Sequence, residues 1–120
     1  MKKILIADDT DKGRELVKTV LEGSGYHVFE ARNGLEAVAG AREHMPDLII
    51  LDLHMPGLDG FGVIQELRGQ KEFATTPIMA LTASAMMGDK ERATAVGFTG
   101  YITKPIRLAD LRREVERLLG

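Results

Sequence analysis

Short apolar runs recur along this chain, and each ends at a polar residue. Continuous runs of this kind are typical of strands buried on both faces, as in a parallel sheet covered by helices. The runs predict five strands, over Lys3–Ala7, Tyr26–Ala31, Leu48–Leu51, Ile78–Leu81 and Tyr101–Thr103.

Apolar residues spaced three or four apart, as on one face of a helix, separate these strands. The five predicted helices carry Leu16, Val17, Val20 and Leu21; Leu35, Val38 and Ala41; Phe61, Ile64 and Leu67; the stretch from Gly88 to Val96; and Leu108, Leu111, Val115 and Leu118. Asp59 can cap the third helix, and Gly13 is expected to loosen the first. Five strands that alternate with five helices predict an α/β fold with a doubly wound parallel sheet.

Composition limits the classes of function. The chain has 120 residues, a length typical of one domain, and its 16 Lys and Arg residues are interspersed with 18 Asp and Glu residues. No basic face is expected, so nucleic acid is not a predicted partner. The absence of cysteine excludes disulfides and thiolate chemistry. No apolar run is long enough for a membrane span or an export signal, so we expect a cytoplasmic protein without a membrane partner.

Five polar residues follow the predicted strands: Asp8 and Asp9 the first, Asp52 the third, Thr82 the fourth and Lys104 the fifth. Because the carboxyl ends of parallel strands share one edge of a sheet, these side chains are expected to meet there. Two carboxylates about 4 Å apart repel by about 4 kcal/mol at an effective dielectric constant near 20, which favours a bound cation. Mg²⁺ prefers oxygen ligands and takes one or two carboxylates. An aspartate beside such an ion, with an amine and a hydroxyl nearby, indicates phosphoryl chemistry.

The same residues resemble the receiver domain of two-component response regulators. The resemblance runs from Lys3 to Leu119. It rests on Asp8-Asp9, on Asp52 within Asp-Leu-His-Met-Pro-Gly-Leu-Asp-Gly, on Thr82-Ala83 and on Lys104-Pro105. It implies a flavodoxin-like receiver fold with strand order 2-1-3-4-5 and five helices. Residues 1–120 would form a single receiver domain with no output domain.

The resemblance also implies roles for the site residues. Asp52 would accept a phosphoryl group from a histidine kinase or a histidine phosphotransfer protein. Mg²⁺ would be bound by Asp9, by Asp52 and by the backbone carbonyl of His54, with Asp8 acting mainly through water. Lys104 would pair with a phosphoryl oxygen and precede a cis peptide bond. The protein would be no enzyme beyond catalysing its own phosphorylation and dephosphorylation.

A conformational switch is implied as well. Thr82 would move toward the phosphoryl group, and Tyr101 would turn inward behind it. The face formed by the fourth helix, fifth strand and fifth helix would then bind a downstream protein target. Met86 and Met87, on the loop after Thr82, are a candidate for an adaptable contact surface, although partner binding there is the less favoured interpretation. The chain is expected to be a monomer or a weak dimer.

Plainer interpretations exist for each residue taken alone. Asp8-Asp9 can cap the first helix, Thr82 can be an ordinary strand-end hydroxyl, Lys104 a surface lysine and Tyr101 a half-buried aromatic.

Three alternative functions share parts of this pattern. A Mg²⁺-dependent phosphatase of the haloacid dehalogenase type shares the aspartate nucleophile, but it needs a second acid two residues later, where this chain has His54. A flavin-binding domain of the flavodoxin type needs a hydroxyl-rich phosphate loop after the first strand. A protein-interaction module that is not phosphorylated would not need the acids, Thr82 and Lys104 together.

Overall fold

The computed structural model describes residues 1–83 and 88–120. The predicted contact residues Met86 and Met87 lie outside the described residues. The elements are β1 (Lys3–Ala7), α1 (Asp11–Gly23), β2 (His27–Ala31), α2 (Gly34–His44), β3 (Leu48–Asp52), α3 (Gly60–Arg68), the 3₁₀ turn η1 (Lys71–Phe73), β4 (Ile78–Thr82), α4 (Asp89–Ala95), β5 (Gly100–Thr103) and α5 (Leu108–Leu119). All five predicted strands and five predicted helices are confirmed, with small shifts at their ends. Within the described ranges, no helix is long and apolar enough to cross a bilayer.

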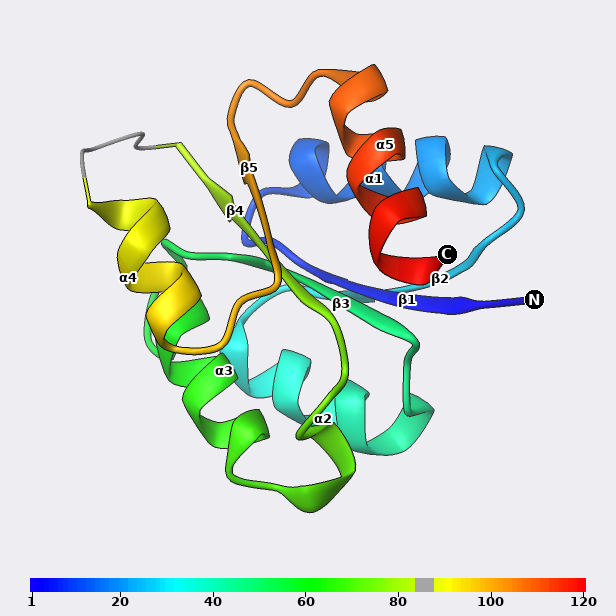
Figure 1. Ribbon diagram of the computed structural model, residues 1–120. Coiled ribbons are helices and arrows are strands. Elements are labelled where there is room, and N and C mark those ends of the chain that lie inside the picture. Colours follow the sequence, from blue (N-terminus) through cyan, green and yellow to red (C-terminus); the bar gives the residue numbers. More distant parts are fainter. Residues whose placement is uncertain (84–87) are drawn as a thin grey trace.

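The five strands form one parallel sheet in the order β2-β1-β3-β4-β5, which confirms the predicted strand order. Helices α1 and α5 cover one face of the sheet, and α2, α3 and α4 cover the other (Figure 1). The chain reverses its direction of winding between β1 and β3. In sheets of this kind, ligands bind at the carboxyl ends of the strands beside that reversal.

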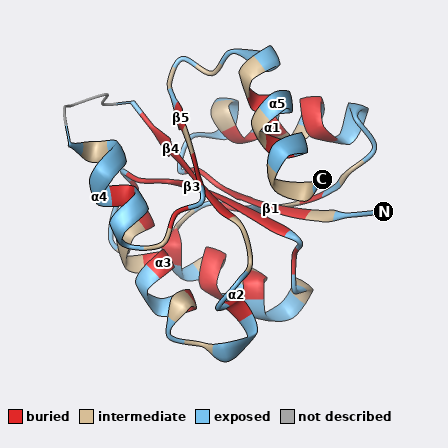
Figure 2. Ribbon diagram, viewed as in Figure 1, coloured by how far each residue is buried: buried red, intermediate tan, exposed pale blue. Residues whose placement is uncertain are grey.

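Two apolar layers hold the sheet between the helices. Alternate strand residues face opposite layers, so Ile4 and Ile6 pack with α1 and α5, whereas Leu5 and Ala7 pack with the other three helices. Every residue of β3 and β4 is buried (Figure 2). The unpredicted turn η1 places Phe73, which is 1% exposed, in the second layer. The fully buried strands β3 and β4 therefore end in Asp52 and Thr82.

The predicted apolar helix faces are wrong at three leucines. Leu16, Leu35 and Leu108 are 42%, 73% and 38% exposed. Successive helical residues are rotated by about 100°, so Leu16 turns outward when its neighbour Val17 faces the sheet. Leu35 is offset in the same way, and Leu108 is the first residue of its helix, where the end is open to solvent. On the buried face of α1, Arg14 lies with Val17, Val20 and Leu21, whereas Leu16 is exposed.

The start of α3 is as predicted. The Asp59 carboxylate accepts a hydrogen bond of 2.9 Å from the backbone N–H of Gly62, which is a helix cap. A Cβ at Gly62 would crowd the end of the Leu58 side chain, which would have to shift.

Candidate functional site

The register of the sheet brings the polar residues after the strands to one edge. Asp8 and Asp52 lie at the ends of β1 and β3, directly after a pair of residues in register. Thr82 of β4 pairs with Thr103 of β5, the residue before Lys104. The backbone N–H of Lys104 donates to the carbonyl of Thr82 at 2.7 Å. Residues from four strands thus converge, as the sequence predicted.

A lysine joins the two buried carboxylates. Nζ of Lys104 lies 3.0 Å from Oδ2 of Asp8 and 2.9 Å from Oδ2 of Asp52. Asp8 is 0% exposed and Asp52 is 4% exposed. Burial lowers the pKa of Lys104, but the hydrogen bonds to Asp52 and Asp8 raise it by more, so the net pKa is raised. Lys104 is therefore no ordinary surface lysine, and its charge partly neutralises the site.

Three carboxylates lie close enough to share one metal ion. Asp8, Asp9 and Asp52 each offer a carboxylate oxygen, and these oxygens lie within 4.8 Å of one another. With Lys104 included, the cluster keeps a formal charge of −2. Asp9 is exposed and accessible to a hydrated ion. Oxygen donors, net negative charge and access to water suit Mg²⁺, so the residues present fit the predicted ion.

The backbone helps to orient Asp52. The N–H of His54 donates to Oδ1 of Asp52 at 2.9 Å, while Lys104 holds the other oxygen. The His54 side chain is exposed. Both oxygens of Asp52 are therefore aligned by donors before any ligand arrives.

Thr82 and the following strand complete the rim. Thr82 is the last residue of β4 and is 0% exposed. The peptide bond between Lys104 and Pro105 is cis, as the resemblance implied. Asp8 and Asp9 do not cap the first helix, because Thr10 occupies the N-cap position. The plainer interpretation of that acidic pair is wrong.

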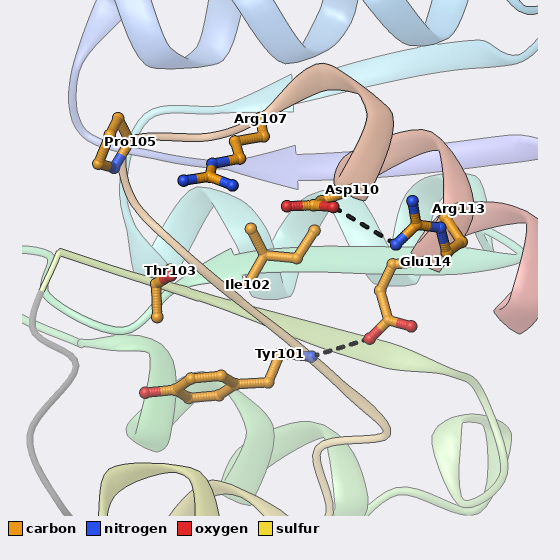
Figure 3. A pocket seen from close by; sticks show the side chains of 8 residues that line it. All are labelled: Tyr101, Ile102, Thr103, Pro105, Arg107, Asp110, Arg113 and Glu114. Carbon is orange, nitrogen blue, oxygen red and sulfur yellow. Dashed lines mark hydrogen bonds and ion pairs between the residues drawn. The ribbon is translucent and has the colours of Figure 1, made fainter.

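Tyr101 lies on β5, at one end of a groove. The groove has a volume of about 520 Å³ and runs between β5 and α5, with the Tyr101 ring at one end and Pro105 and Arg107 at the other (Figure 3). The backbone N–H of Tyr101 donates to Glu114 at 3.4 Å. Burial, followed by the charges of Asp89 and Glu91, raises the pKa of the Tyr101 phenol. Those acids open α4, so Tyr101 lies between α4 and α5.

Sequence reasoning missed Arg14. This residue is buried in α1, and its Nη1 donates to the backbone carbonyl of Asp8 at 2.8 Å. Its guanidinium also contacts Asp11 at 2.6 Å and Glu30 at 3.3 Å. It therefore fixes the turn that carries the acidic pair. An arginine three positions before Val17, on the face that turns toward the sheet, is the signal that could have revealed it.

Comparison with known proteins agrees with this geometry. The family profile described as "Response regulator receiver domain" matches residues 4–116. Among curated relatives, the polar-differentiation response regulator DivK of Brucella anthropi is 39% identical over 119 residues, which span 99% of this chain and 97% of the relative. The chain belongs to the response regulator receiver family, whose members act in two-component signalling with histidine kinases and downstream targets.

Solved structures share the fold closely. The chemotaxis protein CheY4 of Vibrio cholerae superposes with a TM-score of 0.94 at 36% identity, covering 99% of both chains. The receiver domain of a sensor histidine kinase of Pseudomonas aeruginosa superposes with a TM-score of 0.91 at 34% identity, covering 99% of this chain and 98% of that one. That second structure has a magnesium ion coordinated in its active site cleft.

Proposed function

We propose that this protein is a phosphorylation-dependent switch in which Asp52 accepts a phosphoryl group from a histidine kinase or a histidine phosphotransfer protein. In the transfer, the bond between phosphorus and the donor's histidine nitrogen breaks, and a bond between phosphorus and an Asp52 oxygen forms. The observation that carries the proposal is the pair of contacts that Lys104 makes to Asp52 and Asp8. Residues 1–120 act here as one receiver domain, in the cytoplasm.

Mg²⁺ is the cofactor that the acidic cluster suits. Asp9, Asp52 and the backbone carbonyl of His54 would hold the ion, with Asp8 acting through water. The bound ion would supply positive charge at the phosphoryl oxygens. The cluster supports this assignment because its negative charge repels a phosphoryl donor until a divalent cation compensates it.

Phosphorylation changes the charge balance around Lys104 and Thr82. A phosphoryl group adds roughly 1.5 to 2 negative charges and three acceptor oxygens. Lys104 would then pair with a phosphoryl oxygen, and the Thr82 hydroxyl would donate to another. Contacts that exist only in the modified state are what shift a conformational equilibrium.

The response would appear on the face formed by α4, β5 and α5. Thr82 ends β4, and Tyr101 lies on the neighbouring strand, in register with Ala80. Movement of Thr82 toward the phosphoryl group would let Tyr101 turn inward and reshape the groove beside it. A downstream protein target would bind that face, and the chain itself would be a monomer or a weak dimer. Beyond its own phosphorylation and dephosphorylation, no enzymatic activity is proposed.

A direct test uses the full chain with a small phosphodonor and Mg²⁺. The wild type should form an adduct that is stable in acid and labile to hydroxylamine, and Asp52→Asn should form none. Asp59→Asn is a matched control, because asparagine also caps a helix and the residue lies outside the acidic cluster. If the folded wild type forms no adduct, the proposed switch is wrong, and the alternative of an interaction module that is not phosphorylated is favoured. Sustained turnover of a phosphomonoester would favour the phosphatase.

A further inference from the structure

Helix α1 begins without two features that usually stabilise a helix start. Thr10 is the N-cap residue, yet no side-chain hydrogen bond caps the helix. The third helical residue is Gly13, and glycine is the least favourable helix former after proline. In this chain α2 and α3 do have side-chain caps, from Asn33 and Asp59. Helices α4 and α5 also lack a side-chain cap, and α3 also has a glycine as its third residue, so neither feature is peculiar to α1. What distinguishes α1 is the group to which its N-cap residue donates.

Thr10 directs its donors at Asp8 instead. Its backbone N–H and its hydroxyl both lie 2.9 Å from Oδ1 of Asp8. The other oxygen, Oδ2, accepts from Lys104 at 3.0 Å. Since Asp8 is 0% exposed, these three bonds replace the water that a carboxylate would otherwise bind. Both oxygens of Asp8 are thus fixed in direction.

A side chain at Gly13 would crowd two side-chain oxygens. A Cβ atom added there would lie 2.7 Å from Oδ2 of Asp8 and 2.7 Å from the hydroxyl oxygen of Thr10. These are the oxygen that binds Lys104 and the hydroxyl that holds Asp8. Any larger residue would require these two groups to shift, and Asp8 is 0% exposed and held by three hydrogen bonds. The position of Asp8 therefore explains why glycine occurs here, whereas the needs of the helix do not.

We propose that Thr10 and Gly13 are positioning residues for Asp8, which they hold against Lys104 so that the acidic cluster is ready for Mg²⁺. The inference rests on the proposed function, because it gives Asp8 a part in metal binding and phosphoryl transfer. Local departures from good helix chemistry are expected at functional sites, where the stability of an element is secondary to the geometry of a site. Mutation of residues that orient the ligands of a metal ion typically weakens binding of the ion by about 10- to 100-fold.

The test compares two glycines of the same helix in the full chain. A Cβ at Gly23 meets nothing within 4 Å, so Gly23→Ala is a matched control for Gly13→Ala. The dissociation constant of Mg²⁺ is measured by calorimetry, and the rate of adduct formation with a small phosphodonor is measured separately. We expect Gly13→Ala to weaken Mg²⁺ binding by about tenfold or more and to slow the adduct. Gly23→Ala should leave both within about twofold of the wild type.

A second pair of variants covers the case in which Gly13→Ala does not fold. Thr10 is exposed, so Thr10→Val removes the hydroxyl without disturbing the apolar core. It should weaken Mg²⁺ binding several-fold while the variant stays folded, and Thr10→Ser should restore the affinity. Equal Mg²⁺ affinity in the wild type, Thr10→Val and any folded Gly13→Ala would overturn this inference alone. A wild type that neither binds Mg²⁺ nor forms the adduct would overturn the proposed function and this inference together.

Discussion

The ammonium of Lys104 donates to Oδ2 of Asp52 across 2.9 Å, although 52 positions separate the two residues. The contact exists because β3 and β5 flank β4 and their carboxyl ends lie at one edge of the sheet. The same ammonium holds Asp8, so a single cation balances part of a strongly negative cluster. A phosphoryl group on Asp52 would compete for that cation, and this competition links the chemistry to the rest of the domain.

Removal of the shared cation should destabilise the metal-free protein. We expect Lys104→Met to lower the free energy of unfolding by about 1–3 kcal/mol, because it leaves the buried Asp8 carboxylate without its charged donor. Added Mg²⁺ should stabilise the variant more than the wild type, since the ion then meets no competing ammonium. Urea unfolding with a chelator and with Mg²⁺ measures both effects.

Lys18→Met provides the control for that experiment. Lys18 pairs with Glu30 at 3.3 Å, and the side chains of both residues are more than a third exposed. Surface pairs of this kind contribute about 0–1 kcal/mol, so this variant should differ little from the wild type with or without Mg²⁺. Similar losses in the two lysine variants would contradict a special role for Lys104.

Above neutral pH, the contribution of Lys104 to stability should change only in alkaline solution. Burial lowers its pKa, but bonds to Asp52 and Asp8 outweigh burial and raise the pKa above the ordinary value. A raised pKa in the folded state gives stability that is complete below the unfolded pKa, about 10.4, and is lost as pH rises through the folded pKa. The difference in unfolding free energy between the wild type and Lys104→Met should therefore stay constant from pH 7 to about pH 10 and shrink above it. A difference that shrinks between pH 7 and 9 would argue against this.

Thr82 should couple the modified site to the surface without being required for modification. We expect Thr82→Ala to form the adduct but to lose the response of the β5 amides, over Gly100–Thr103, that phosphorylation causes in the wild type. Thr82→Ser keeps the hydroxyl and should keep the response. Coupling of about 1–3 kcal/mol is typical of such switches, which corresponds to a change of about 5- to 150-fold in partner affinity. Two-dimensional NMR spectra before and after phosphodonor distinguish the variants, and an unchanged response in Thr82→Ala would remove the hydroxyl from the pathway.

Loss of the Arg68 guanidinium, far from the acidic cluster, should lower stability but leave Mg²⁺ binding unchanged. The Arg68 guanidinium donates to the backbone carbonyls of Phe73, Thr76 and Gly97, at 2.6, 2.7 and 2.7 Å. These bonds tie the end of α3 to the loops before β4 and β5. Arg68→Met should cost about 2–4 kcal/mol of unfolding free energy, since it leaves several partly buried carbonyls without a donor. Its Mg²⁺ affinity should equal that of the wild type, as calorimetry can show.

The fold could be predicted from the sequence because two kinds of local information agreed. Continuous apolar runs such as Leu48–Leu51 marked strands buried on both faces, and the helical spacing between them left a single topology class. The 3₁₀ turn at Lys71–Phe73 was missed, because three residues carry no periodicity. The leucines assigned to buried faces failed where helix rotation or a helix end decided exposure, as at Leu16.

The site could be predicted only in part. Strand ends placed Asp8, Asp52 and Lys104 together, since parallel strands end at one edge. The spacing of Arg14 before Val17 indicates the inward face of the helix, but local sequence could not show that its guanidinium would bind the Asp8 carbonyl. Nor could it show that Gly13 makes room for a carboxylate five residues earlier. Both depend on how α1 is rotated over β1, which is decided by packing.

The most direct measurement is the location of the phosphoryl group itself. The full chain is treated with a small phosphodonor and Mg²⁺, the adduct is trapped by reduction with borohydride, and the modified residue is mapped by mass spectrometry of peptides. We predict a single modified residue, Asp52, and no modification when Mg²⁺ is removed by a chelator. Modification of Asp8 or Asp9 in place of Asp52, or labelling that does not depend on Mg²⁺, would contradict the proposed switch.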